Sequence, residues 1–113
     1  MAVYANVSEL EEILPYKFTD TSNPTETQVL SIITRHSSRI DLLLKTRGIS
    51  SPSEGTIQHS FLKQAVLYLT AMDVLRRKAI ETGQASSALA DDYERLAGQL
   101  LDTIQNNPQA LVT

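Results

Sequence analysis

The chain has 113 residues, of which 42% are hydrophobic, 20% charged and 5% aromatic, and its formal net charge is −3. This length fits one domain, and the high apolar fraction with so small a net charge argues against a chain that is disordered throughout. Cysteine is absent, which excludes disulfides, thiolate metal ligands and cysteine nucleophiles. No apolar run approaches the ~20 residues of a membrane span, and the first residues lack a secretory signal's basic and apolar blocks. We therefore expect a soluble domain made in the cytosol, with an aliphatic core.

Charge is distributed unevenly along the chain. Residues 1–34 hold five acids and one base, residues 35–80 hold eight bases and three acids, and residues 81–113 hold five acids and one base. A basic middle between acidic ends is one signature of a nucleic-acid surface. Attraction between segments of a bundle, or between subunits, is the simpler interpretation, because a pI near 5.3 is poor for non-specific phosphate binding.

Hydrophobic spacing predicts an all-α bundle of four main helices, near residues 8–14, 24–47, 57–82 and 87–105. For the first helix, Ser8 and Glu11 have capping-box spacing. For the second, Asn23 is the predicted N-cap, and Gly48 is placed to end the helix in a left-handed conformation.

The third predicted helix begins after the N-cap Thr56 and is unusual in composition. From Ile57 to Ile80, 14 of 24 residues are apolar, so the apolar pattern nearly encircles the helix. Such a helix is either central in its bundle or covered by a second molecule. The fourth helix, capped by Ser86 or Ser87, has a narrow apolar face. The predicted centre of the core is formed by Ile33, Ile40, Leu44, Phe61, Leu69, Met72, Leu75, Tyr93, Leu96 and Leu100.

Side chains that could carry chemistry do not form a catalytic or metal-binding pattern. His36 and His59 have no second ligand at i+3 or i+4, so we interpret His36 as a core or interface imidazole with one backbone partner and His59 as solvated. The cluster of residues 76–78, Arg-Arg-Lys, fits the C-terminal end of a helix, and a phosphate or acidic-partner site is the alternative. Gly98 is either tolerated or marks the close approach of another backbone. We expect no enzyme, no metal and no cofactor.

Three segments together resemble a known family: residues 3–11 (VYANVSELE), 62–78 (LKQAVLYLTAMDVLRRK) and 88–101 (ALADDYERLAGQLL). They are similar to the small all-helical head–tail connector, or adaptor, proteins of long-tailed bacteriophages and prophages, sometimes labelled putative DNA-packaging proteins. The resemblance implies a ring below the portal that extends the DNA channel and docks the next neck protein. It implies a portal protein and a downstream neck or tail protein as partners, with DNA only as passing cargo. The location would be the virion neck, after synthesis in the bacterial host cytoplasm.

Two sets of residues are the candidates for these contacts. Val66, Leu67 and Val74 project away from the main apolar stripe of the third helix, so we predict that they form a subunit contact rather than core. The other contact residues are acids of the fourth helix that would meet bases of the next copy, namely Asp91, Glu94 and Asp102 against Arg35, Arg39, Lys63 and Arg77. We expect a monomer at low concentration and a ring on the portal or at high concentration.

The resemblance also implies a role for the C-terminal tail. Residues 1–105 would form the single domain, and residues 106–113 a tail that docks on the portal through Gln109, Ala110, Leu111, Val112 and Thr113. The alternative function is a small helical DNA-binding regulator, suggested by the basic middle and by two helices joined by a short loop. Against it, the connection over residues 49–56 is longer than the turn of 3–4 residues in a helix-turn-helix.

Overall fold

The computed structural model describes residues 3–84 and 87–112, and all regular structure in these ranges is helical. The elements are α1 (Val7–Ile13), α2 (Glu26–Thr46), α3 (Ile57–Glu81), α4 (Ala88–Asn106) and a short 3-10 helix, η1 (Pro108–Leu111). The prediction of an all-α bundle with four main helices is therefore confirmed. None of the helices in the described ranges combines the length and the hydropathy that a bilayer span requires.

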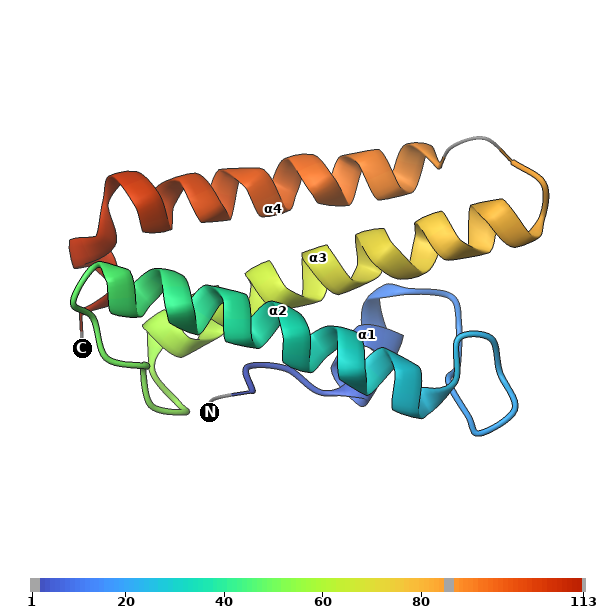
Figure 1. Ribbon diagram of the computed structural model, residues 1–113, viewed down its shortest axis with the longest axis horizontal. Coiled ribbons are helices and arrows are strands. Elements are labelled where there is room, and N and C mark those ends of the chain that lie inside the picture. The colour runs from blue at the N-terminus through green and yellow to red at the C-terminus, as the bar shows by residue number, and fades with distance from the viewer. Residues whose placement is uncertain (1–2, 85–86, 113) are drawn as a thin grey trace.

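Helix α3 is the centre of the bundle (Figure 1). It runs between α4 on one side and α2 on the other, and α1 packs against both α2 and α3. On one side of α3, Tyr68 stacks on Tyr93 of α4; on another side, Asp73 bonds to His36 of α2. Because neighbours surround α3, its nearly all-round apolar pattern is explained within one chain.

The start of α1 differs from the predicted capping box. Asn6, rather than Ser8, is the N-cap: its side chain accepts a hydrogen bond from the Glu9 amide at 2.9 Å, and the Glu9 carboxylate accepts one from the Asn6 amide at 3.0 Å. The sequence contains two pairs at the same spacing, and Asn6 and Glu9 make the cap. Glu11 instead accepts a hydrogen bond from the backbone amide of Phe18 at 2.8 Å, which holds the following loop against α1.

The start of α2 also lies later than predicted. Thr25, rather than Asn23, is the N-cap, and it forms a capping box with Gln28. The reason is that the preceding loop extends through Pro24, whose carbonyl accepts a hydrogen bond from the Ser22 hydroxyl at 2.7 Å. The predicted N-cap Thr56 of α3 is confirmed, and Ser87 caps α4.

Two glycines behave differently. Gly48, after the end of α2, has a φ of +74°, as predicted for a left-handed helix end. At Gly98 in α4, an added Cβ would meet no neighbouring atom within 4 Å. No other backbone approaches there in the described part of the chain, so a tolerated glycine is the interpretation that holds.

The core overlaps the predicted set only in part. Ile33, Ile40, Leu44 and Leu75 are buried, whereas the other six predicted residues are partly exposed: Phe61, Leu69, Met72, Tyr93, Leu96 and Leu100. The largest fully buried side chains also include several residues outside the prediction, namely Tyr4, Leu10, Val29, Leu62, Val66, Val74 and Ile104. The main apolar stripe predicted for α3 does not mark its most buried side, because Val66 and Val74, which project away from that stripe, have no exposed surface.

Candidate functional site

The three apolar residues predicted at a subunit contact belong to the core. Val66 and Val74 have no exposed surface, and Leu67 is 8% exposed. Lys63 lies one turn before Leu67 on the same face of α3 and pairs with Glu9 of α1, so this face is covered by the N-terminal part of the chain. The prediction that one bundle would leave these three residues exposed is wrong, because α1 and α2 cover the side of α3 that was expected to be bare.

Two of the three α4 acids that were predicted to meet another copy, Asp91 and Glu94, have a partner in their own chain. Arg76 of α3 lies 2.9 Å from a Glu94 carboxylate oxygen and 3.6 Å from one of Asp91. The hydrogen bond to Glu94 is the main reason that the pKa of Arg76 lies above its usual value, and Asp91 adds to it. Arg76, from the cluster of residues 76–78, therefore joins α3 to α4.

The remaining charged candidates are divided between paired and unpaired residues. Lys63 lies 2.6 Å from a carboxylate oxygen of Glu9, and Arg35 lies 3.4 Å from one of Asp73. The other three make no ion pair within residues 3–84 and 87–112: Arg39, Arg77 and Asp102. The structure thus does not gather the predicted interface residues into one site.

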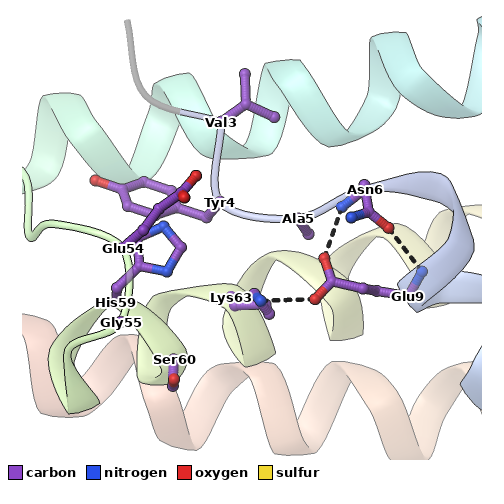
Figure 2. A pocket seen from close by; sticks show the side chains of 10 residues that line it. All are labelled: Val3, Tyr4, Ala5, Asn6, Glu9, Glu54, Gly55, His59, Ser60 and Lys63. Atoms are coloured by element: carbon purple, nitrogen blue, oxygen red, sulfur yellow. Dashed lines mark hydrogen bonds and ion pairs between the residues drawn. The ribbon is translucent and has the colours of Figure 1, made fainter.

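A hollow of about 470 Å³ lies where the N-terminal segment crosses the first turns of α3 (Figure 2). Its lining residues come from three segments and comprise Val3, Tyr4, Ala5, Asn6, Glu9, Glu54, Gly55, His59, Ser60 and Lys63. The Glu9 carboxylate bonds to both the Lys63 ammonium and the Asn6 amide, so these polar groups satisfy one another. No group of three His, Asp or Glu side chains able to hold a metal occurs among the described residues.

Tyr4 anchors the N-terminal segment on the bundle. Its phenol donates a hydrogen bond to the buried Asp41 carboxylate, and the Ser51 hydroxyl donates to the same carboxylate oxygen at 2.9 Å. Its backbone amide donates to the Ser37 hydroxyl at 3.1 Å. Burial raises the pKa of Tyr4 above its usual value, and the hydrogen bond to Asp41 raises it further.

The same segment explains why the prediction for His59 is wrong. Its imidazole is 8% exposed rather than solvated, because the Tyr4 ring covers it with ring centroids 5.3 Å apart. Sequence reasoning missed the Tyr4 anchor. The available signal was Asp41 itself, a carboxylate next to Ile40 near the buried side of a predicted helix, where a charge needs a partner.

His36 joins α2 to α3. It is buried, as expected, but its partner is a side chain and not a backbone group: Nε2 lies 2.6 Å from a carboxylate oxygen of Asp73. Its Nδ1 is buried without a hydrogen-bond partner in the described part of the chain. Burial acts to raise the pKa of Asp73, but the hydrogen bond from His36 and the charges of His36 and Arg35 outweigh it, so the pKa lies below its usual value.

The C-terminal residues predicted to dock on the portal are partly built into the bundle. Leu111 of η1 is buried in the core, whereas Gln109, Ala110 and Val112 are exposed, and Thr113 lies outside the described residues. An apolar hollow of about 190 Å³ separates η1 from the start of α3, lined by Ile57, Gln58, Phe61, Thr103, Ala110 and Leu111. The exposed residues of this segment remain available for contact, and Leu111 does not.

Three clusters of polar side chains connect different elements of the fold through hydrogen bonds and ion pairs. Each cluster joins two or three elements: Arg76 joins α3 to α4, His36 joins α2 to α3, and Tyr4 joins the N-terminal segment to α2. A scan against protein-family models, a search of the curated proteins and a search of the solved structures found no match for this chain.

Proposed function

We propose that this protein is a structural component of a tailed bacteriophage or prophage, a head–tail connector that assembles as a ring below the portal. In this role it extends the DNA channel and docks the next neck protein, with no catalysis and no cofactor. Its partners are the portal protein, the downstream neck or tail protein and further copies of itself. DNA is only passing cargo, and no membrane is involved.

The observation that carries the proposal is the resemblance over three segments of the chain. Residues 3–11 form the N-terminal segment with the larger part of α1, residues 62–78 lie within α3, and residues 88–101 lie within α4. These segments pack on one another in the bundle, so the resemblance concerns elements that fold together rather than isolated stretches.

Electron microscopy tests the proposal directly. The purified protein, imaged alone at low and high concentration and mixed with the portal protein of the same genome, should form rings on the portal. Val112→Asp, in the exposed part of the C-terminal segment, should weaken portal binding. Ile80→Asp is the matched control, because Ile80 is also exposed but lies near the other end of α3. A protein that neither forms rings nor binds the portal would contradict the proposal.

The alternative of a small DNA-binding regulator rests on the basic middle of the chain, residues 35–80, and on two helices joined by a short loop. A gel shift with non-specific duplex across a salt series separates the two functions. A regulator should bind with affinity that falls steeply with salt, because it releases counterions from the phosphates, whereas a connector should bind weakly or not at all.

A further inference from the structure

The hollow between the N-terminal segment and the first turns of α3 has two ends, and their polar groups differ in how far they are satisfied (Figure 2). At one end, the Lys63 ammonium lies 2.6 Å from a carboxylate oxygen of Glu9, so these two charges neutralise each other. Toward the other end lie Glu54, His59 and Tyr4 (Figure 2). The groups at this second end are the ones that a ligand could still engage.

Glu54 brings an uncompensated charge to the hollow. Its carboxylate makes no ion pair with residues 3–84 or 87–112. The other acid and the base of the lining, Glu9 and Lys63, are paired with each other. The lining is therefore negative overall, and a negative lining favours a cation over an anion as the ligand.

His59 adds a hydrogen-bonding group that the fold does not use. The residue is 8% exposed, and its ring contacts Tyr4 but forms no hydrogen bond with the described part of the chain. Figure 2 shows the imidazole directed toward the hollow. One nitrogen of a neutral imidazole has a lone pair that accepts a hydrogen bond, and a polar group this deeply buried is stabilised by a partner. A ligand in the hollow that donates a hydrogen bond would supply that partner.

Tyr4 holds this end of the hollow in place before any ligand arrives. Its hydroxyl is bonded to the buried Asp41 carboxylate, and its ring lies against His59 with ring centroids 5.3 Å apart. The imidazole is thus fixed against a wall that is itself anchored, so little ordering is needed on binding. The face of an aromatic ring also attracts a nearby cation.

We propose that this end of the hollow binds the primary ammonium group of a small organic amine, through the carboxylate of Glu54 and the imidazole of His59. An ammonium group has three donors, so it can pair with the carboxylate and donate to the imidazole at the same time. The hollow, at about 470 Å³, has room for the carbon chain of such a ligand. A metal ion suits the site less well, because the described residues contain no group of three His, Asp or Glu able to hold one. This inference goes beyond the proposed function and does not depend on it.

Titration with n-butylamine tests the site, and n-butanol is the uncharged counterpart of the same chain length. Both are added to isotope-labelled protein, and the backbone amides are followed by NMR. We expect n-butylamine to shift the amides of Gly55, His59 and Ser60, which line the hollow, and n-butanol to leave them in place. Equal shifts with the two probes, or no shifts at these residues with n-butylamine, would overturn the proposal.

Two substitutions test the two groups separately. Glu54→Gln removes the charge and should weaken n-butylamine binding at least about tenfold. His59→Phe keeps a ring against Tyr4 but removes the acceptor, and should weaken binding about threefold or more. Glu12→Gln is the matched control, because Glu12 is also an exposed acid without an ion pair among the described residues but lies outside the hollow. Wild-type affinity in Glu54→Gln, whose side chain is exposed and not needed for folding, would overturn the proposal whether or not the His59 variant folds.

A second probe distinguishes a small amine from the lysine side chain of another protein, because both offer the same ammonium group. This probe is lysine blocked at its amino and carboxyl groups, which has the four-carbon chain of n-butylamine together with a peptide backbone. Binding of n-butylamine at least as tight as that of the blocked lysine supports a small amine as the ligand. Binding of the blocked lysine alone would overturn that assignment, since the site would then recognise a protein.

Discussion

The hydroxyl of Tyr4 and the carboxylate of Asp41, 37 residues apart in the chain, form a buried hydrogen bond that fastens the N-terminal segment to α2. Ser51, from the loop after α2, donates to the same carboxylate. Three segments therefore meet at one buried charge, and the cost of burying that charge is offset by the hydrogen bonds it accepts.

Removing the Tyr4 hydroxyl should destabilise the fold. We expect Tyr4→Phe to lower the free energy of unfolding by ~1–3 kcal/mol, because the buried Asp41 carboxylate loses a donor while the ring remains. Urea denaturation followed by circular dichroism measures the change. Tyr16→Phe is the matched control, since the Tyr16 hydroxyl makes no hydrogen bond with the described residues. Equal stability of the two variants would contradict the anchoring role of the hydroxyl.

The same tyrosine should make stability depend on alkaline pH. Burial raises the native pKa of Tyr4 above the unfolded value, which is about 10. The native state thus keeps a proton that the unfolded state releases, so stability falls as pH rises above about 10. When unfolding is measured from neutral to alkaline pH, the free energy of unfolding of Tyr4→Phe should fall less steeply than that of the wild type. If the free energy of unfolding of the variant fell as steeply as that of the wild type, groups other than Tyr4 would cause the loss of stability at alkaline pH.

Asp73 should make the stability of the fold depend on acid pH. Its native pKa lies below the unfolded value of about 3.9, so its contribution is present above that pH and is lost as pH falls toward the native pKa. Asp73→Asn should cost ~1–3 kcal/mol at neutral pH, because His36 loses a charged partner. Acid unfolding of the variant should also depend less on pH below about 4 than that of the wild type.

A substitution at Leu67 tests whether this side of α3 is buried within a single chain. We expect Leu67→Glu to destabilise the monomer by more than ~3 kcal/mol, because a carboxylate would be placed in the core. Leu42→Glu, at an exposed position of α2, should change stability by no more than ~0.5 kcal/mol. Thermal unfolding at low protein concentration compares the two. A Leu67 variant that melts like the wild type would mean that this side of α3 is open.

Two leucines of α3 and α4 should differ in their contribution to the core. Leu75 is buried, so Leu75→Ala should cost ~2–5 kcal/mol, the usual range for a leucine in the core. Leu96 is only partly buried, so Leu96→Ala should cost about 1 kcal/mol or less. Urea unfolding of both variants gives the comparison. A larger loss at Leu96 than at Leu75 would contradict the observed position of the core.

The number and order of the helices could be predicted from the sequence, because local signals decide them. Thr56 and Ser87 cap their helices with their own side chains, and Gly48 ends α2 in a left-handed conformation. The buried face of α3 could not be predicted in the same way. When apolar residues nearly encircle a helix, their periodicity does not indicate one buried face, because the packing of the neighbouring helices determines which side is covered.

The polar contacts between elements could not be predicted either, because the sequence analysis treats one helix at a time. His59 is covered by Tyr4, and His36 bonds to Asp73. Each of these pairs joins segments that lie far apart in the chain. A helical projection places a residue on a face but does not say which other segment crosses that face. The candidate interface failed for this reason at Val66, Leu67 and Val74.

The position of α3 between α2 and α4 has a consequence for how the chain reaches its native state. Each long helix packs on the next one in the sequence, so most contacts close short loops, and topologies of this kind fold in milliseconds or faster. Contacts from the N-terminal segment to α2 and α3 close much longer loops. We therefore expect the three long helices to associate early, and the N-terminal segment to complete the native state by docking onto a bundle that already exists.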